Sequence, residues 1–382
     1  MQFGADFTAL IDRFSSEPDR RIALAVSGGS DSLALLSLCH TWAGKQDRRL
    51  IVFTVDHGLR PEAQDEAKRV AALCDRLQVP HQILHWTNPK PSQNAARRAR
   101  YDLIAEAMAQ VGARCLLTGH TLDDVIENVF IRRRRGVRGA LSVGPGLAAP
   151  MPTWPAGQNL TVLHPLVGAR RSGLRAYLDR LGVSWIDDPS NQNMKFERVR
   201  IRAFFERHPN LQDGIVSAVT ALQRQRAELD LAIGQSLAQV TVLPDGLIVT
   251  SDQGDLVRLL GLLARMASGG DRDPRRSAVI ALISSLAQPG ARQTLGGAWF
   301  QRTRTGFLVG RDPAEPILDS EASLFDGRYA RDPNARFLDR NETSFLVRHA
   351  LPPDAGWRES ISTRVAHLRL CFGTPHQSTG VE

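Results

Sequence analysis

The residues best suited to chemistry form one short turn near the start of the chain, Ser27-Gly28-Gly29-Ser30-Asp31-Ser32. The turn follows the apolar run 22–26 and precedes the leucine-rich stretch 33–38, so we expect a strand to lead into it and a helix to follow it. Two glycines let the backbone approach a ligand closely, and a helix N-terminus attracts an anion. The serines add hydroxyl donors, and Asp31 could hold a metal ion on a phosphate.

The turn lacks the lysine of a Walker loop, and no G-x-x-x-x-G-K-[ST] motif occurs anywhere in the chain. A Walker lysine serves transfer of the γ-phosphoryl group. A loop without that lysine fits transfer of AMP, with pyrophosphate as the leaving group. A bare Ser-Gly-Gly would be more typical of an ordinary turn, but the full six-residue pattern is far more specific. It predicts a site for the pyrophosphate part of ATP.

Carboxylates gather after another expected strand. Thr118-Gly119-His120 ends that strand, and Asp123, Asp124 and Glu127 occupy the first turns of the next helix. Helix capping alone would account for the two aspartates. Asp124 and Glu127 are three residues apart, however, and therefore share a helix face. Because the trio lies at the same expected sheet edge as the turn, we favour binding of Mg²⁺ or of a ligand's ammonium group.

Other polar residues follow the same edge. Asp56 and His57 come directly after a strand, where they could contact adenosine or accept a proton. Arg97 and Arg100 share one face of an expected helix, and we favour contact with phosphate over a merely solvated face. The densest basic run, Arg132–Arg138, closes the acidic helix, where cations complement the helix dipole or contact nucleic acid.

The elements that must position these residues alternate through the first half of the chain. Expected strands cover 21–26, 50–55, 82–86 and 115–118, and expected helices cover 30–41, 63–77, 94–111 and 123–134. This order predicts an α/β fold with a doubly wound parallel sheet. Ligands of such sheets bind at the carboxyl ends of the strands, beside a topological switch point. The polar motifs fall at those ends.

The second half of the chain is less regular. The Gly- and Pro-rich segment 144–159 indicates a loop that leaves the core, and a helix is expected at 170–181. A long helical region over about 197–237 leads to a smaller α+β region. We expect three parts: a nucleotide-binding domain, a helical linker with a second domain, and an extension to which no chemistry is assigned. Their boundaries are 1–205, 206–312 and 313–382.

Composition limits the class of protein. The 382 residues carry 48 Lys and Arg against 40 Asp and Glu, a net charge of +8. This balance suits a polyanionic partner, although an arginine preference from GC-rich coding would produce it too. No apolar run reaches membrane length and no signal peptide is evident, so we expect a cytoplasmic protein. The four cysteines stand singly, which speaks against a zinc ribbon or a sulfur-relay pair.

Taken together, the motifs resemble a known family. The turn resembles the pyrophosphate loop of the N-type ATP pyrophosphatases, the PP-loop superfamily with its adenine nucleotide alpha hydrolase-like fold. The ordered set is similar to the tRNA(Ile)-lysidine synthases, and its members are 27–32, 55–60, 95–101, 118–127, 132–136 and 188–202. The chain departs from that pattern at five positions, which are Val125, Asn128, Val137, Arg138 and Val199.

The resemblance implies a ligase reaction in two steps. ATP adenylates the carbonyl oxygen at carbon two of the cytidine in the first anticodon position of a CAU-anticodon isoleucine tRNA, and pyrophosphate leaves. The ε-amine of free L-lysine then attacks that carbon and AMP leaves, which gives lysidine. The modified base reads the codon AUA in place of AUG.

The resemblance also implies roles for the candidate residues. Catalysis is expected of Asp31, Asp123, Asp124, Glu127 and Arg97. ATP is expected to contact Ser27, Gly28, Gly29, Ser30, Asp31, Ser32, Asp56, His57, Gly119 and His120, with Mg²⁺ on Asp31. Lysine is expected at Asp123, Asp124 and Glu127, and phosphate or tRNA at Arg100, Arg132, Arg135, Arg198 and Arg202. The second domain would hold the body of the tRNA, and monomer and homodimer both stay open.

Three other functions fit parts of the pattern. A tRNA thiolase with the same loop would need sulfur-carrying cysteines, which are not paired here. A small-molecule ligase such as an NAD, GMP or asparagine synthetase fits poorly with a basic second half and no glutaminase domain. A nucleotide-binding module like a universal stress protein would lack Asp31 and the carboxylate trio.

Overall fold

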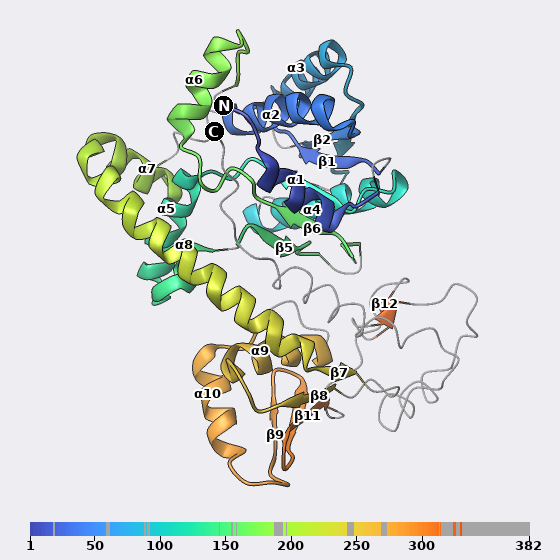
Figure 1. The fold of residues 1–382 in the computed structure, drawn as a ribbon, viewed down its shortest axis with the longest axis vertical. Coiled ribbons are helices and arrows are strands. Elements are labelled where there is room, and N and C mark those ends of the chain that lie inside the picture. Colours follow the sequence, from blue (N-terminus) through green and yellow to red (C-terminus); the bar gives the residue numbers. More distant parts are fainter. Residues whose placement is uncertain are drawn as a thin grey trace. The chain divides into compact units, whose positions relative to one another are not determined.

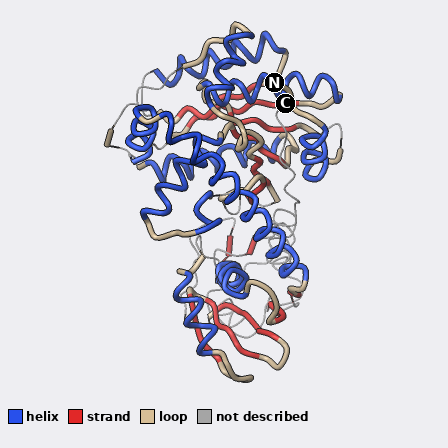
Figure 2. Tube along the Cα trace, turned by 60° about the vertical axis from the view of Figure 1, so that its left-hand side comes forward, coloured by secondary structure: helices blue, strands red, loops and turns tan. Residues whose placement is uncertain are grey.

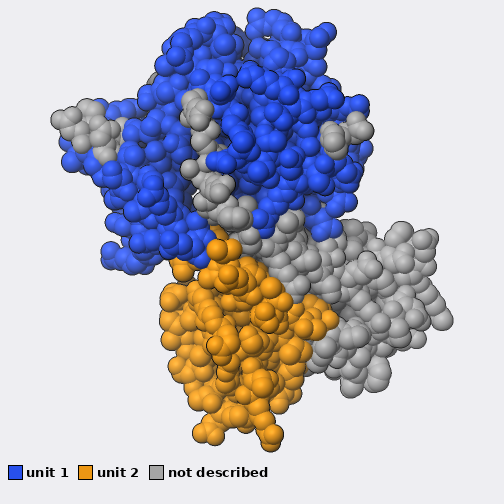
Figure 3. All heavy atoms as spheres, viewed as in Figure 1, with its two compact units in different colours: residues 1–228, 375–382 blue, residues 229–374 orange. Residues whose placement is uncertain are grey.

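The computed structural model describes residues 1–312 and five residues beyond, at 314, 324–325 and 329–330. Gaps within the first range fall at 18–19, 59–61, 88, 90–91, 145, 154–155, 158, 187–193, 196, 243–247 and 269–272. The motif residues 59–60 and 188–191 and the cysteine at 371 therefore lie outside the described residues. The described chain forms two compact units, which divide between Glu228 and Leu229 (Figure 3).

A six-stranded sheet organises the first unit, in the order β3-β2-β1-β4-β6-β5 (Figure 1). Its strands are β1 (Ile22–Ala25), β2 (Leu50–Asp56), β3 (His81–His85), β4 (Cys115–Thr118), β5 (Ala148–Pro150) and β6 (Thr161–Leu163). All neighbouring pairs are parallel except β5 and β6. The chain runs outward from β1 to β3 and then returns to β4 on the other side of β1. The switch point therefore lies between β1 and β4.

Helices lie on both faces of this sheet (Figure 2). They are α1 (Ala5–Phe14), α2 (Ser30–Gln46), α3 (Glu62–Leu77), α4 (Gln93–Gln110), α5 (Leu122–Arg134) and α6 (Arg171–Arg180), with a 3₁₀ turn η1 (Gly139–Val143). Two further helices follow, α7 (Glu197–Arg207) and α8 (Pro209–Ala238). The predicted doubly wound α/β fold is thus confirmed.

The pleat of the strands explains how both faces are covered. Ala23, Ile51 and Leu116 point to one face and pack with Ile104 and Met108 of α4. Their chain neighbours point to the opposite face, because side chains alternate along a strand. Right-handed crossovers from β1 to β2 and from β2 to β3 place α2 and α3 on that second face. Strands buried on both faces explain the continuous apolar runs in the sequence.

One expectation from the sequence was wrong in detail, and another was confirmed. The segment 144–159 is not simply a loop, because β5 lies within it and closes the sheet edge by pairing with β6. The long helical region expected over about 197–237 is confirmed, and it consists of two helices, α7 and α8, which divide just before Pro209. Proline cannot donate the backbone hydrogen bond of a helix interior and is best tolerated in a first turn.

The second unit has an antiparallel sheet in the order β7-β8-β11-β10-β9. Its strands are β7 (Thr241–Val242), β8 (Ile248–Ser251), β9 (Arg292–Leu295), β10 (Ala298–Arg302) and β11 (Gly306–Arg311). Two helices, α9 (Leu256–Ser268) and α10 (Arg276–Ser285), pack on it around a core that includes Phe300 and Phe307. The hairpin predicted over 298–310 is confirmed as β10 and β11. A short pair, β12 (Leu324–Phe325) and β13 (Tyr329–Ala330), lies beyond.

Among the described residues, no helix has both the length and the apolar character needed to cross a membrane.

Gly119, just after β4, gives a test of how this sheet edge is built. A Cβ at position 119 would lie 3.0 Å from the backbone of Asp31 and Ser32 in the first turn of α2. We expect Gly119→Ala to displace that turn and to destabilise the fold by about 1–3 kcal/mol, the usual effect of overpacking. Urea unfolding measures the loss. Gly168→Ala is the control, because its Cβ meets nothing within 4 Å; an equal loss in both variants would contradict this reading.

Candidate functional site

The turn after β1 has a fixed shape of its own. Gly28 adopts a φ of +84°, which favours glycine, and Gly29 begins α2 without any side chain that caps the helix. The Ser32 hydroxyl donates to the Gly29 carbonyl at 2.9 Å and accepts the Ser27 backbone N–H at 3.2 Å. Ser32 therefore holds the turn closed from within, while the first N–H groups of α2 face the position of an anion.

The segment after α6 returns to this turn. The Ile186 N–H donates to the Gly28 carbonyl at 3.0 Å. A Cβ at position 28 would lie 3.2 Å from the end of the Ile186 side chain. Ile186 thus lies directly against the turn.

The acidic residues after β4 are held by the start of α5. Thr121 caps the helix by accepting the Asp124 N–H, and Asp124 in turn accepts the Thr121 N–H at 2.9 Å. This capping box occupies one oxygen of Asp124. The other oxygen, Oδ1, points toward Arg171 at 3.5 Å. Capping and a role in the site are therefore both served by the same carboxylate.

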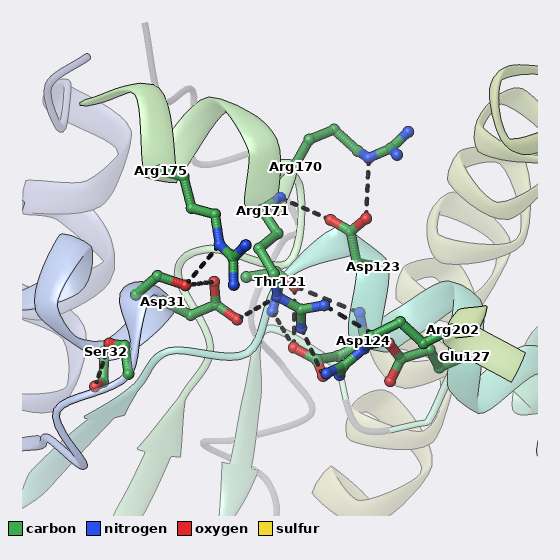
Figure 4. Close-up of polar contacts among 12 residues, drawn as sticks. Asp31, Ser32, Thr121, Asp123, Asp124, Glu127, Arg170, Arg171, Arg175 and Arg202 are labelled. Atoms are coloured by element: carbon green, nitrogen blue, oxygen red, sulfur yellow. Dashed lines mark hydrogen bonds and ion pairs between the residues drawn. The ribbon is translucent and has the colours of Figure 1, made fainter. Parts of the chain in front are cut away.

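Arg171, the first residue of α6, lies among three of the acidic residues (Figure 4). Its Nε donates to Asp31 Oδ2 at 2.8 Å, and its two terminal nitrogens lie 3.5 Å from Asp124 Oδ1 and 3.7 Å from Glu127 Oε1. Arg171 thus joins the first turn of α2 to the first turns of α5. The sequence analysis did not single out this residue.

Two neighbours of Arg171 on α6 reach the same edge. Arg170 Nε lies 3.3 Å from Asp123 Oδ1, and the Arg171 backbone N–H donates to Asp123 Oδ2 at 2.7 Å. Arg175 Nε donates to the Ser30 hydroxyl at 3.4 Å in the first turn of α2 (Figure 4). The start of α6 therefore presents arginines to both the turn and the carboxylates.

Glu127 is the most buried of the carboxylates, with a side chain only 3% exposed. Arg202 Nε donates to its Oε1 at 3.0 Å, and Arg198 Nε lies 3.0 Å from its Oε2 as an ion pair. Arg198 also donates to Asn128 Oδ1 at 2.7 Å. Two arginines predicted to contact phosphate or tRNA therefore contact the acidic residues from α7.

Burial and charge shift the carboxyl groups in different directions. Burial raises the pKa of Asp31, against the opposing charge of Arg171. Burial and the neighbouring charge of Asp124 raise the pKa of Glu127. Burial acts on Asp124 too, but Arg171 and the Thr121 backbone N–H outweigh it and hold the Asp124 pKa below its usual range. Among Asp31, Asp124 and Glu127, Asp124 is therefore the one whose pKa is shifted in favour of the charged form.

Two neutral histidines lie behind the site. The Thr118 hydroxyl contacts Nδ1 of His120 at 2.8 Å and Nδ1 of His164 at 2.7 Å. Burial lowers the pKa of His120 to about 4 and holds that of His164 well below its usual value. His120 is consequently neutral at pH 7 and able to accept a proton or a hydrogen bond. His164 is a second residue that the sequence analysis missed.

Four further predicted residues, from the turn after β2 and from α4, lie around the site. Asp56 accepts the Gly58 N–H at 2.9 Å and shapes the turn after β2. Arg97 and Arg100 lie over the Tyr101 ring and are close enough to lower the pKa of His120, which places α4 at the site edge. Burial and Arg100 lower the pKa of His57 as well.

Arg132 and Arg135 are not brought into the acidic group. They belong to the end of α5, where Arg132 donates to the Leu141 carbonyl at 3.1 Å. Arg135 lies 3.3 Å from Glu197, which Arg134 contacts as well.

The described residues form no preassembled metal-binding site. In the described part of the chain, no three His, Cys, Asp or Glu side chains gather as a metal site. Mg²⁺ commonly binds through one or two carboxylates together with substrate phosphates, however. Asp31, beside the turn and with a side chain 20% exposed, fits that simpler arrangement.

The buried imidazole of His120 predicts a pH dependence of stability. Its pKa is about 4 in the folded protein against 6.5 for an ordinary histidine, so the unfolded chain holds more protons between those values. The free energy of unfolding should therefore fall as pH drops through this window. We expect His120→Asn to reduce that slope by up to about 1.4 kcal/mol per pH unit. Urea unfolding of both proteins at pH 5 and 6.5 measures this slope. An unchanged slope in His120→Asn would refute the lowered pKa of His120.

Comparison with known proteins identifies the family. A family model described as a PP-loop domain matches residues 3–208. A tRNA(Ile)-lysidine synthase of Hyphomonas neptunium is 36% identical over 353 residues, which cover 90% of this chain and 95% of the relative. The tRNA(Ile)-lysidine synthase of Rhizobium meliloti is 37% identical, and the match covers 81% of this chain and 72% of the relative. That of Brucella anthropi is 34% identical, and the match covers 89% of this chain and 79% of the relative. The protein therefore belongs to the tRNA(Ile)-lysidine synthase family of PP-loop ligases.

Proposed function

We propose that the protein ligates L-lysine to carbon two of the cytidine at the first anticodon position of CAU-anticodon tRNA(Ile), with ATP converted to AMP and pyrophosphate. The observation that carries the proposal is the juxtaposition at the switch point. A turn shaped for pyrophosphate and a group of carboxylates suited to an ammonium meet at one sheet edge, joined by Arg171. The family to which the chain belongs supports the same reaction.

ATP would bind across the carboxyl ends of β1 and β4. The backbone of Gly28 and Gly29 and the first N–H groups of α2 would hold the pyrophosphate, with Ser27 and Ser30 as further donors. Asp31 would hold the Mg²⁺ that arrives with ATP, which would offset phosphate charge as the bond to pyrophosphate breaks. The neighbouring arginines of α4, Arg97 and Arg100, would face the phosphates or the leaving group.

Lysine would enter on the α5 side of the site. Asp123, Asp124 and Glu127 would hold its ammonium group, which must lose a proton before the amine can attack carbon two. The raised pKa of Glu127 makes it a better proton acceptor than an ordinary carboxylate, so Glu127 is the candidate to take that proton. Neutral His120 lines the site behind the same residues, and its pKa of about 4 makes it a weaker proton acceptor than an ordinary histidine.

The tRNA would be held by surfaces beyond the sheet edge, and its anticodon base would be turned out into the pocket. We assign residues 1–205 to catalysis and 206–312 to holding the tRNA body, with 313–382 as an extension. Arg275, Arg276 and Arg304 are exposed in the second of these parts and suited to phosphate contact. The proposal places the enzyme in the cytoplasm and is compatible with a homodimer.

A tRNA thiolase, the main alternative, finds less support. Cys39, Cys74 and Cys115 are buried and unpaired. Burial raises the pKa of Cys74 and of Cys115 to about 12, so neither thiol is prepared to carry sulfur as a thiolate.

Pyrophosphate release with ATP, L-lysine and CAU-anticodon tRNA(Ile), each omitted in turn, tests the proposal. Without tRNA no pyrophosphate should appear, and without lysine the release of pyrophosphate should stop after a single round.

We expect Glu127→Gln to raise KM for lysine by about 10- to 100-fold, because a charged hydrogen bond to the ammonium is lost. Glu197→Gln is the matched control, since Glu197 contacts Arg134 and Arg135 but lies outside the acidic group. A Glu127 variant with normal use of lysine and weakened ATP binding would overturn the assignment.

Salt dependence tests the nucleic-acid partner. Phosphate contacts release counterions, so about five contacts predict a log–log slope of affinity against salt near −4. Arg133 is exposed near the end of α5, and we expect Arg133→Ala to make the slope shallower by about one unit.

Arg20→Ala is the matched control for charge. Arg20 contacts Glu17 just before β1, at the opposite end of the strands from the site. The slope of this variant should equal that of the unmodified protein. A flat salt response of the unmodified protein would speak against tRNA and in favour of a small-molecule ligase.

A further inference from the structure

The carboxylates proposed to hold lysine already have cationic partners in the chain itself. Asp123 is paired with Arg170, Glu127 with Arg198 and Arg202, and Arg171 lies against Asp31, Asp124 and Glu127. Four carboxylates thus face four guanidinium groups. A lysine ammonium that enters this group would add a positive charge to a set that is already balanced, so one of the internal cations must give way.

Arg171 is the cation that contacts both the turn and the carboxylates of α5. Its short contact is to Asp31 at 2.8 Å, on the side of the turn. Its contacts to Asp124 and Glu127 are longer, at 3.5 and 3.7 Å. Arg202, in contrast, donates a 3.0 Å hydrogen bond to Glu127, its one carboxylate partner among the described residues. Arg171 is therefore the guanidinium that can leave the α5 carboxylates while it keeps a partner.

The position of α6 supplies a reason for Arg171 to move. Arg171 and Arg175 both reach the first turn of α2, where they contact Asp31 and Ser30. A pyrophosphate group at this turn would bring several negative charges within reach of the Arg171 guanidinium. Because guanidinium groups bind phosphate oxygens in a bidentate manner, the nucleotide would compete with Asp124 and Glu127 for Arg171.

We propose that Arg171 is a positioning residue that couples the two substrate sites, because it occupies the place of the lysine ammonium until the nucleotide draws it toward the turn. The inference rests on the proposed function. It predicts that ATP binds before lysine and that each ligand strengthens binding of the other, since coupling between two sites is reciprocal. It also explains how buried carboxylates stay compensated when no lysine is present.

The test is lysine binding measured by calorimetry on the full-length protein, with and without α,β-methylene-ATP, whose bridge cannot be cleaved. We expect the analogue to tighten binding of lysine to the unmodified protein by about tenfold. In Arg171→Gln, lysine should bind more tightly than to the unmodified protein without the analogue, and the analogue should add nothing. A residue that only supported the structure would show the opposite, weaker binding in both conditions.

Two further variants keep the result interpretable. Arg171→Lys retains a charge and guards against misfolding. Its one nitrogen replaces the three guanidinium nitrogens that contact Asp31, Asp124 and Glu127, so coupling should fall there too. Arg180→Gln is the matched control, because Arg180 is exposed at the C-terminal end of α6, and coupling should persist in it.

Equal lysine affinity with and without the analogue in the unmodified protein would overturn the inference, as would coupling that survives in Arg171→Gln. Either result would leave the proposed function intact if pyrophosphate release still required tRNA and continued only with lysine. Loss of those two requirements would instead overturn the function itself.

Discussion

The structure of the site depends on compensation of buried charge. A carboxylate removed from water is strongly destabilised unless a cation and hydrogen bonds accompany it, and here several are held within one group. Helices α2 and α5 bring the carboxylates, while α6 and α7 bring arginines from far along the chain. The fold must therefore return α6 to the sheet edge, which it does directly after β6. Without that return, the acidic turn of α5 could not be buried at the switch point.

The sheet and the turn could be predicted from the sequence because their signals are local. Strands buried on both faces appear as continuous apolar runs, and β4 was predicted at its observed bounds, Cys115–Thr118. The short strands β5 and β6 gave no such signal, since each has three residues. Helix α1 was not predicted either, although Phe7 in its first turn packs against Trp42 of α2.

The carboxylates were predicted as a group, but their partners were not. Pairing across the chain, as between Asp31 and Arg171, depends on which loops return to the switch point, and spacing in the sequence does not reveal that. One signal was present. Arg170 and Arg171 stand at the start of α6, where the positive end of the helix dipole disfavours cations. Arginines placed against the dipole indicate that carboxylates outside the helix must hold them.

Departures from the family pattern have local explanations on α5 and α7. Val125 and Val199 are buried and contribute to the packing of their helices. Asn128 accepts a hydrogen bond from Arg198, so its amide helps to aim that guanidinium at Glu127. These residues adjust the support of the acidic group and leave its carboxylates in place.

The hydroxyl of Ser32 has a consequence for the energetics of nucleotide binding. Because it bonds to both Ser27 and Gly29, the turn is ordered by the folding of the chain and not by its ligand. The conformational entropy of those residues is lost once, during folding, and little remains to be lost when ATP arrives. The free energy of contact with pyrophosphate is then available for drawing neighbouring side chains toward it. A rigid turn is, in this sense, what allows the groups around it to move.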